Sequence, residues 1–267
     1  MNQNISIIGC GWLGFSLAKK LMPEGYNVSG STTSSEKLHN LVSSGIEGYI
    51  IKLSTDGITG NIEMCLNNCR TLIINIPPGL RKDPKKNYVQ QLKHLIPYIE
   101  LGTIKNIIFI SSTSIYNDDV SIPRITELSP TSSLPSARQL INAEVLFKDN
   151  KHFNTTILRL SGLYGNDRHP ANYLSGKTDI KNPNAPVNLI HQTDCILIIL
   201  SIIEQGIWNE TFNASTTHHS RLRYYTSICK TKGLLPPKFD MTRKSEGKII
   251  DSSKLEQILG YRFKVKL

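Results

Sequence analysis

Apolar and polar positions alternate along this chain in blocks. Short runs rich in Ile, Leu and Val recur, and stretches with helix-like spacing separate them; the runs are "ISIIG", "YNVSGS", "GYIIKL", "RTLIINI", "NIIFISS" and "TTILRLSG". Strands that read as continuous apolar runs are typical of a parallel sheet covered by helices on both faces. We predict the intervening helices near residues 12–23, 34–44, 60–68, 84–101 and 136–149. The pattern therefore predicts an α/β fold with a doubly wound parallel sheet of the Rossmann type.

The alternation becomes less regular after about residue 161. A strand-like "VNLIH", a strongly apolar helix near 193–205, a strand "TFNAS" and a helix near 219–232 follow, and the tail "KIIDSSKLEQILGYRF" predicts a strand and a helix that ends at Gly260. We expect a dinucleotide-binding domain over residues 1–160, which also receives elements near 187–215. Residues 161–267 are expected to form a smaller, interleaved substrate lobe at the carboxyl ends of the strands.

Composition narrows the class of protein. The chain has 267 residues, 39% of them hydrophobic, which is enough for a well-buried core. "MNQN" at the start lacks the positive charge of a secretory signal, and the longest apolar run, "CILIILSII", is about half of what a bilayer requires. We expect a cytoplasmic protein without a membrane partner. The odd number of scattered cysteines predicts reduced thiols and no metal site.

The net charge of +10 suits an anionic partner. The basic residues form no dense run, and no nucleic-acid-binding signature is present, so we expect a small molecule and no nucleic acid.

Three glycines carry the first chemical signal. Gly9, Gly11 and Gly14 have the spacing G-x-G-x-x-G between a predicted strand and a predicted helix. In that context the first glycine permits a tight turn, the second lets a pyrophosphate approach, and the third lets helix and strand pack closely. We therefore predict a dinucleotide site here. It includes the intervening Trp12 and Leu13, for which packing on the sheet is the alternative.

The end of the second strand bears on which dinucleotide is bound. A site that prefers NAD usually offers Asp or Glu to the ribose 2′-hydroxyl, but this chain has no acid before Glu36. Hydroxyl groups and helix-start amides at Ser31, Thr32, Thr33 and Ser34, together with Lys37, could instead hold a 2′-phosphate. The cofactor is predicted to be NADP, with NAD as the alternative. Ser34 has a simpler interpretation as a helix N-cap.

The order of landmarks resembles the extended short-chain dehydrogenase/reductase superfamily, in its NAD-dependent epimerase/dehydratase branch. The matching segments cover nearly the whole chain in the same order; they are "GCGWLG", "IIFISSTSIYND", "ARQLINAE", "LRLSGLYG", "NLIHQTD", "TFNAS" and "SSKLEQILGYRF". The resemblance implies a nicotinamide cofactor and chemistry on a small carbonyl or hydroxyl substrate, a class that includes sugar derivatives.

The resemblance also implies roles for individual residues. Ser112 matches the hydroxyl that orients the substrate, with Ser111 and Thr113 as alternatives; we assign Ser111 to the cofactor and Thr113 to the substrate. Other positions match the segments that line the adenine, the ribose and the nicotinamide, and His191 matches a segment that shapes the cleft. The implied cofactor-lining positions are Ile76, Pro77, Leu160, Gly162 and Leu163, with Pro78 and Gly79 completing the wall beside the adenine.

This chain departs from the family at the catalytic Tyr-x-x-x-Lys pair. Those positions hold Ser136 and Leu140, and neither can serve as the acid or supply the positive charge. We therefore assign the chain to the atypical subgroup that lacks the pair. The loop "GNDRHPANYLSGK" could compensate, with His169 as proton donor and Arg168, Tyr173 and Lys177 toward the substrate. Substrate binding without catalysis, or simple solvation, is the alternative for this loop. Arg81 and Lys82 could add charge toward a phosphate, with a solvated turn as the alternative.

Two function classes remain open. The first is an NAD(P)-dependent, epimerase/dehydratase-like oxidoreductase, and the second is a non-catalytic sensor or regulator that binds NADP(H). By analogy with the family, a homodimer would form through the helices near 84–101 and 136–149.

Overall fold

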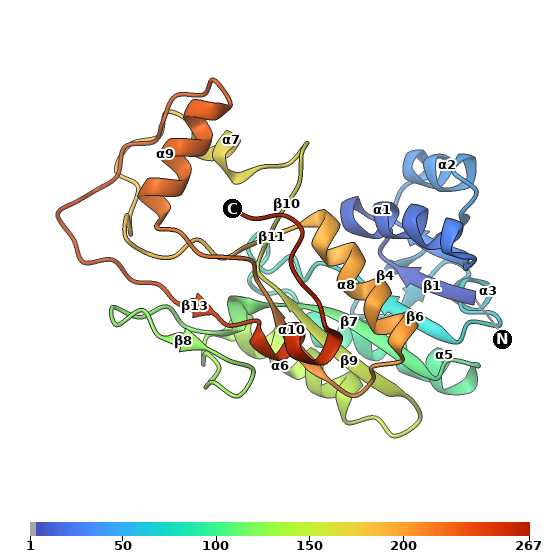
Figure 1. The fold of residues 1–267 in the computed structure, drawn as a ribbon. Helices are drawn as coiled ribbons and strands as arrows, with labels where there is room; N and C mark the ends of the chain where they lie inside the picture. Colours follow the sequence, from blue (N-terminus) through green and yellow to red (C-terminus); the bar gives the residue numbers. More distant parts are fainter. Residues whose placement is uncertain (1–3) are drawn as a thin grey trace. The chain divides into compact units, whose positions relative to one another are not determined.

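A seven-stranded sheet forms the centre of the fold (Figure 1). The structure, a computed structural model, describes residues 4–267. The strand order is β12-β9-β7-β6-β1-β2-β3, and β1 pairs in parallel with both β2 and β6. The predicted α/β doubly wound class is therefore confirmed. The strands are β1 (Asn4–Ile8), β2 (Asn27–Thr32), β3 (Glu47–Ile50), β6 (Thr71–Ile74), β7 (Asn106–Ser112), β9 (Asn154–Leu160) and β12 (Thr211–Ala214).

The chain divides into two compact units. The first contains residues 4–112, 133–158 and 199–211. Strand order reverses direction at β1, so right-handed crossovers place α1 and α2 on one face of the sheet and α4, α5 and α6 on the other. Figure 1 shows this division for α1 and α2 against α5 and α6. The helices are α1 (Trp12–Leu21), α2 (Ser35–Ser43), α3 (Ile62–Cys65), α4 (Tyr88–Lys93), α5 (Ile96–Leu101) and α6 (Pro135–Lys148), and η1 (Met22–Glu24) extends α1.

Two elements of the first unit differ from the prediction. The long helix expected near 84–101 is two helices, α4 and α5, because Pro97 has no N–H to continue the helical ladder and instead lies in the first turn of α5. The single strand expected over "GYIIKL" ends at Ile50. Its last part, β4 (Lys52–Leu53), turns away from the sheet and pairs antiparallel with β5 (Ile58–Thr59).

Burial explains why the apolar runs form the centre. All four residues of β6 are buried, and Ile73 and Ile108 on neighbouring strands have no exposed surface. Strands without an exposed face must be covered on both sides, which is what the helices of the two faces do.

The second unit contains residues 113–132, 159–198 and 212–267. Two small parallel ribbons organise it, β10 with β11 and β13 with β8. Its last helix ends at Gly260 with a left-handed φ of 59°, as the sequence predicted. The elements are η2 (Thr113–Ile115), β8 (Arg124–Ile125), β10 (Gly162–Tyr164), α7 (Pro170–Leu174), β11 (Leu189–His191), α9 (Arg221–Thr231), β13 (Ile249–Ile250) and α10 (Ser253–Leu259), while α8 (Gln192–Gln205) begins here and ends in the first unit.

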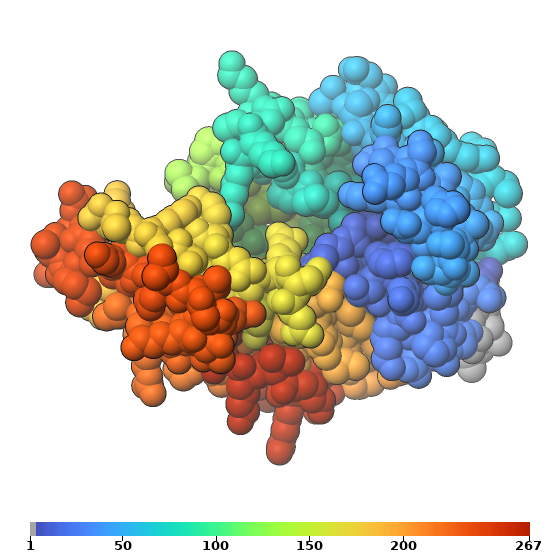
Figure 2. All heavy atoms as spheres, turned by 90° about the horizontal axis from the view of Figure 1, so that it is seen from above, coloured from blue at the N-terminus to red at the C-terminus, as the bar shows by residue number. Residues whose placement is uncertain are grey.

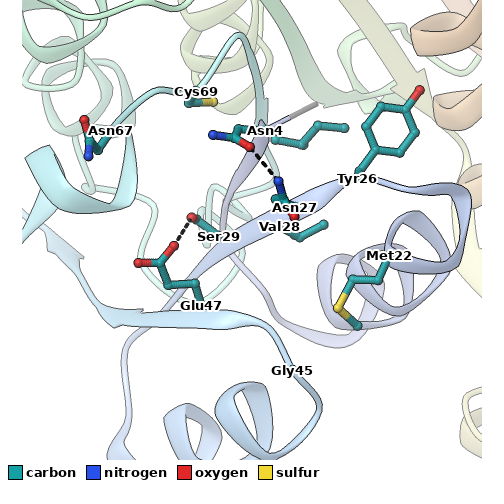
Figure 3. A pocket seen from close by; sticks show the side chains of 11 residues that line it. Asn4, Met22, Tyr26, Asn27, Val28, Ser29, Gly45, Glu47, Asn67 and Cys69 are labelled. Carbon is teal, nitrogen blue, oxygen red and sulfur yellow. Dashed lines mark hydrogen bonds between the residues drawn. The ribbon is translucent and has the colours of Figure 1, made fainter. Parts of the chain in front are cut away.

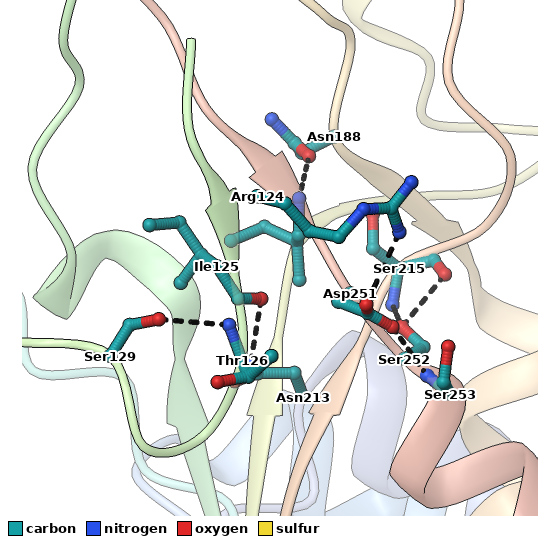
Figure 4. Close-up of polar contacts among 11 residues, drawn as sticks. Arg124, Ile125, Thr126, Ser129, Asn188, Asn213, Ser215, Asp251, Ser252 and Ser253 are labelled. Atoms are coloured by element: carbon teal, nitrogen blue, oxygen red, sulfur yellow. Dashed lines mark hydrogen bonds and ion pairs between the residues drawn. The ribbon is translucent and has the colours of Figure 1, made fainter. Parts of the chain in front are cut away.

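Side-chain hydrogen bonds join distant segments of the second unit (Figure 4). The Asn188 amide donates to the Lys248 carbonyl at 2.8 Å and accepts from the Ile250 amide at 3.0 Å. The Ser252 hydroxyl accepts from the Ser215 amide and donates to the Ser215 carbonyl. These bonds attach β13 and the start of α10 to the loops before β11 and after β12.

A buried polar network holds the interior of the same unit. The Tyr116 hydroxyl donates to the Asn213 side chain at 3.0 Å and accepts from the Arg159 guanidinium at 2.6 Å. Arg159 also donates to the Glu127 carbonyl, and the Glu127 carboxylate accepts from the Asn213 amide at 2.7 Å. Because each of these polar groups has a hydrogen-bond partner, the free-energy cost of burying it is offset.

Asp194 anchors the C-terminal segment. Its carboxylate has no exposed surface and accepts three hydrogen bonds, from the Tyr261 hydroxyl and from the amides of Lys264 and Val265. The segment after α10 is thereby fixed to the start of α8.

Within residues 4–267, no helix combines the length and the apolarity that crossing a membrane requires, and this includes the apolar α8.

Replacing Asp194 with Ala should lower the free energy of unfolding by about 3 kcal/mol, because a buried hydroxyl and two backbone amides lose their acceptor. Urea denaturation measures the loss. Asp56→Ala, at an exposed carboxylate in a turn, is the control and should change stability by less than about 0.5 kcal/mol. Equal effects of the two substitutions would contradict the anchoring role.

Candidate functional site

The glycine turn after β1 has two glycines that the protein's own packing requires. Gly9 has a φ of 103°, and a Cβ there would lie 2.4 Å from the Asn75 carbonyl oxygen. A Cβ on Gly14 would lie 2.5 Å from the Gly9 carbonyl oxygen. These distances are too short for any side chain, so both positions are explained by the close approach of β1, α1 and the end of β6.

Gly11 is different. A Cβ at Gly11 would meet no atom within 4 Å, its φ of −78° suits any residue, and the residue is exposed. Gly11 is also the N-cap of α1, and no side chain caps the helix or places an acid in its first turn. The missing side chain therefore leaves open space directly in front of helix amides, which is the arrangement that receives a phosphate.

Three hydrogen bonds fix the shape of this turn. The Gly9 amide donates to the Ser31 hydroxyl at 3.0 Å, and the Cys10 amide donates to the Ser31 carbonyl at 2.7 Å. The Asn75 side chain donates to the Gly9 carbonyl at 2.9 Å. Ser31, predicted to contact the cofactor, is buried and its hydroxyl supports the turn. Burial raises the pKa of the Cys10 thiol to about 12, so this thiol stays protonated.

The hydroxyl side chains at the end of β2 differ in their exposure to solvent. Thr32 is buried, whereas Thr33 is exposed. The Ser34 hydroxyl caps α2 by accepting from the Lys37 amide, as its simpler interpretation predicted. The groups that face solvent at this strand end are therefore Thr33, the first turn of α2 and the exposed Lys37 side chain.

The remaining predicted positions of the first unit lie at the ends of β6 and β7. Ile76 is half-buried, and its carbonyl accepts from the Tyr88 hydroxyl at 2.9 Å, while Pro77 is exposed. Ser111 is buried and donates to the buried Glu144 carboxylate on α6 at 2.5 Å. Ser112, the next residue, is half-buried.

The positions that the resemblance matches to a Tyr-x-x-x-Lys pair are both on α6. Ser136 is exposed in its first turn, and Leu140 is buried. Neither position carries a proton donor of suitable pKa or a positive charge.

In the second unit, Thr113 and Ser161 are buried and their hydroxyl oxygens lie 3.3 Å apart. Leu160 is buried at the end of β9, and Leu163 is half-buried in β10. Gly162 is exposed, and a Cβ there would lie 2.6 Å from the Leu189 side chain, so close pairing of β10 with β11 requires this glycine.

His169 belongs to a buried aromatic cluster. Its Nδ1 accepts from the Ala171 amide and caps α7, so the proton is on Nε2, which lies 3.0 Å from the Tyr224 hydroxyl. The Tyr164 ring contacts both His169 and His191 edge-on. Burial, with Lys232 and His191 nearby, lowers the pKa of His169, so the ring is neutral at pH 7.

The other predicted residues of this loop are on the surface. Tyr173 is 75% exposed, and the Lys177 ammonium lies 3.1 Å from the centre of its ring. Arg168 is exposed. His191, by contrast, is buried in β11, and its Nδ1 accepts from the Thr193 amide at 3.1 Å.

A cavity of about 590 Å³ lies elsewhere on the first unit (Figure 3). Its walls come from the amino ends of β1 and β2 and from the loops before β3 and β6, with Asn27, Ser29 and Glu47 among the lining residues. Ligands of open α/β sheets bind at the opposite, carboxyl edge. No sequence motif marked this cavity, and it is separate from the glycine turn.

Comparisons with known proteins agree with this geometry. Residues 4–125 match the family model described as the NAD binding domain of 6-phosphogluconate dehydrogenase. The solved UDP-N-acetylglucosamine 4-epimerase from Bacillus cereus has a TM-score of 0.80 at 18% identity, covering 99% of this chain and 95% of that one. MoeE5 in complex with UDP-glucose and NAD has a TM-score of 0.78 at 17% identity, covering 99% and 94%. The chain thus has the fold of NAD-binding nucleotide-sugar epimerases.

Two further similarities extend over the whole chain. A functionally unknown conserved protein from Silicibacter pomeroyi DSS has a TM-score of 0.79 at 20% identity, covering 99% of this chain and 95% of that one. Protein YeeZ from Escherichia coli strain K12 is 30% identical over 265 residues, which are 98% of this chain and 96% of the relative. At that identity and coverage, the chain belongs to the family of Escherichia coli protein YeeZ.

Proposed function

We propose that this protein is an NAD(P)-dependent, epimerase/dehydratase-like oxidoreductase of the atypical subgroup, which prefers NADP(H) and acts on a small sugar-type carbonyl or hydroxyl substrate. The observation that carries the proposal is the open space at Gly11. The packing of the protein explains Gly9 and Gly14 but leaves Gly11 unexplained, whereas a pyrophosphate in front of α1 explains it.

The preference for NADP(H) rests on the end of β2. No carboxylate is present there before Glu36, and the exposed groups are the Thr33 hydroxyl, the first turn of α2 and Lys37. A 2′-phosphate would gain from the helix amides and the ammonium group, whereas an NAD site usually uses a carboxylate at this place.

The proposed chemistry is hydride transfer, which the nicotinamide ring of the bound dinucleotide supplies or accepts. Ser112 would orient the substrate by hydrogen bonding, and Thr113, Arg168, Tyr173, Lys177 and His191 would contact it. The accompanying proton is assigned to the His169–Tyr224 pair. Nδ1 of His169 is occupied by the Ala171 amide, so Nε2 carries the proton toward the Tyr224 hydroxyl.

A second candidate function is binding of NADP(H) without turnover, as a sensor or regulator. It is favoured by Ser136 and Leu140, which remove the family's acid and its positive charge. The burial of His169 favours it as well.

For either function we propose a homodimer through the helices that follow β6 and β7.

Gly11→Ala should weaken NADPH binding at least tenfold in a fluorescence titration, because the methyl group occupies the phosphate position. Its free energy of unfolding should fall by less than about 1 kcal/mol, since the methyl group meets no protein atom. Gly9→Ala is the matched comparison. It should lose more than about 2 kcal/mol of stability through its positive φ and the clash with Asn75. NADPH binding to Gly11→Ala at wild-type affinity would contradict the site.

Thr33→Asp should reverse the cofactor preference. The wild type is expected to bind NADPH more tightly than NADH, and the new carboxylate should weaken NADPH binding at least tenfold by repelling the 2′-phosphate. Ser44→Asp, at the other end of α2, is the control and should leave the ratio of the two affinities unchanged. Tighter NADH binding by the wild type would refute the NADP preference.

His169→Asn separates proton donation from capping, because Asn is a good N-cap but no acid. In NADPH oxidation with a panel of carbonyl compounds, the folded variant should lose at least 100-fold in rate. Tyr224→Phe should lose rate similarly. Full activity in both variants would exclude the pair as donor. A wild type that binds NADPH but oxidises it with no carbonyl in the panel would favour the sensor.

A further inference from the structure

The cavity at the amino ends of β1 and β2 has no part in the proposed function. Its origin lies in the connection from β3 to β6, which contains the short hairpin of β4 and β5 and a helix, α3, of only four residues. A parallel sheet is normally covered by full helices on both faces. Here a short helix and loops do the covering, and the 590 Å³ space lies between the loop after α3 and the first residues of the strands.

The strands bring polar side chains to this cavity, where a parallel sheet usually has apolar ones. Asn4 and Asn27 are register partners on β1 and β2, and the Asn27 amide donates to the Asn4 side chain at 3.0 Å. Ser29 and Glu47 are register partners on β2 and β3, and the Ser29 hydroxyl donates to the Glu47 carboxylate at 3.1 Å. Figure 3 shows both hydrogen bonds. All the lining residues belong to the blue-to-cyan part of the chain, which Figure 2 shows gathered on the right side of the view.

The Glu47 carboxylate is held in one orientation by two neutral hydroxyl groups. One of its oxygens accepts from Ser29, and the other accepts from the Tyr49 hydroxyl at 2.5 Å. Burial and the hydrogen bond to Glu47 raise the pKa of Tyr49 to about 12, so this hydroxyl stays protonated and remains a donor. Glu47 makes no ion pair within residues 4–267. Its negative charge is therefore oriented but not neutralised.

The charge at the cavity has the opposite sign to that of the protein. The chain has a net charge of +10, yet none of the described residues that line the cavity is Lys, Arg or His. Arg70, next to the lining residues along the chain, is exposed and is not one of them. Burial and the nearby Glu204 and Glu24 carboxylates raise the pKa of Tyr26, which lines another wall. An anion would find no positive partner in this cavity, whereas a cation would find a carboxylate.

The remaining walls fit the carbon chain of an organic cation. Ile5, Met22 and Val28 contribute apolar surface, and the exposed Asn67 adds an amide oxygen that can accept a hydrogen bond. The volume lies in the range of sites that bind small molecules. A carboxylate at one place and apolar surface with further acceptors elsewhere match an ammonium group on a short aliphatic chain.

We propose that this cavity binds a small organic cation with a primary ammonium group on an aliphatic chain, such as a diamine. The ammonium group would donate to the Glu47 carboxylate, which the two hydroxyl groups already orient. The inference does not depend on the proposed function, because the cavity lies at the amino ends of the strands and the glycine turn follows the carboxyl end of β1.

The test is a calorimetric titration of putrescine, 1,4-diaminobutane, into the purified protein. Because the net charge of +10 repels a cation, non-specific attraction cannot account for binding. Glu47→Gln removes the charge and keeps the size of the side chain, so it should weaken putrescine binding at least about tenfold. Glu256→Gln, at an exposed carboxylate in α10 of the second unit, makes the same change of charge and should stay within about twofold of the wild type.

A second variant tests the same site by a gain of affinity, which a folding defect cannot imitate. Asn67→Asp places another carboxylate in the lining at an exposed position and should tighten putrescine binding at least about threefold. The uncharged 1,4-butanediol should bind at least about tenfold more weakly than putrescine.

Three outcomes would overturn the inference. These are no putrescine binding by the wild type, equal binding by Glu47→Gln and the wild type, and butanediol binding as tight as that of putrescine. None of them bears on NADPH binding at the glycine turn, so the inference and the proposed function stand or fall separately.

Discussion

The close contact between the glycine turn and the end of β6 is the constraint on which this fold's functional edge depends. Gly9 must lack a side chain because the Asn75 carbonyl occupies its position, and the Asn75 amide holds the Gly9 carbonyl at 2.9 Å. This contact places the first residue after β1 beside the first residue after β6. Two features lie next to this contact: the open space at Gly11 in front of α1, and the start of the loop of residues 77–87.

The second unit is organised by buried polar groups instead. Its ribbons have two or three residues per strand, too few to define a lobe by backbone pairing alone. The network around Asn213 and Arg159 and the three bonds to Asp194 supply the missing order. Such networks are costly when one partner is removed, so they specify a single arrangement of loops that apolar packing would leave free.

Sequence reasoning predicted the fold because the strands are buried on both faces and therefore read as apolar runs, and because the glycines recur at a spacing with few other uses. It also predicted the helix end at Gly260. It could not predict which hydroxyl groups are already hydrogen-bonded to other parts of the protein. Ser31 binds the Gly9 amide across 22 residues, and Ser111 binds Glu144 across 33. A sequence shows that a side chain can donate or accept, whereas its partner is set by the packing of distant elements. Pro97 indicates a break between α4 and α5, but the apolar pattern continues across it and predicts a single helix.

Leu140, at the position that the resemblance matches to a lysine, and the loop of residues 77–87 belong to the same part of the first unit. Leu140 removes a positive charge from α6 and is buried there, so its position offers nothing to a ligand. The next residue toward the N-terminus, Gln139, accepts from the amide of Val89 at 3.2 Å, which ties α6 to the first turn of α4. That turn follows Lys86 by two residues. The loop of residues 77–87 thus brings four basic side chains to this part of the unit. A lysine next to a tyrosine lowers the pKa of the phenol, but a group of cations on a loop has no such phenol beside it on α6. The four basic side chains of residues 77–87 therefore cannot supply the activation that a lysine gives to the tyrosine of a Tyr-x-x-x-Lys pair.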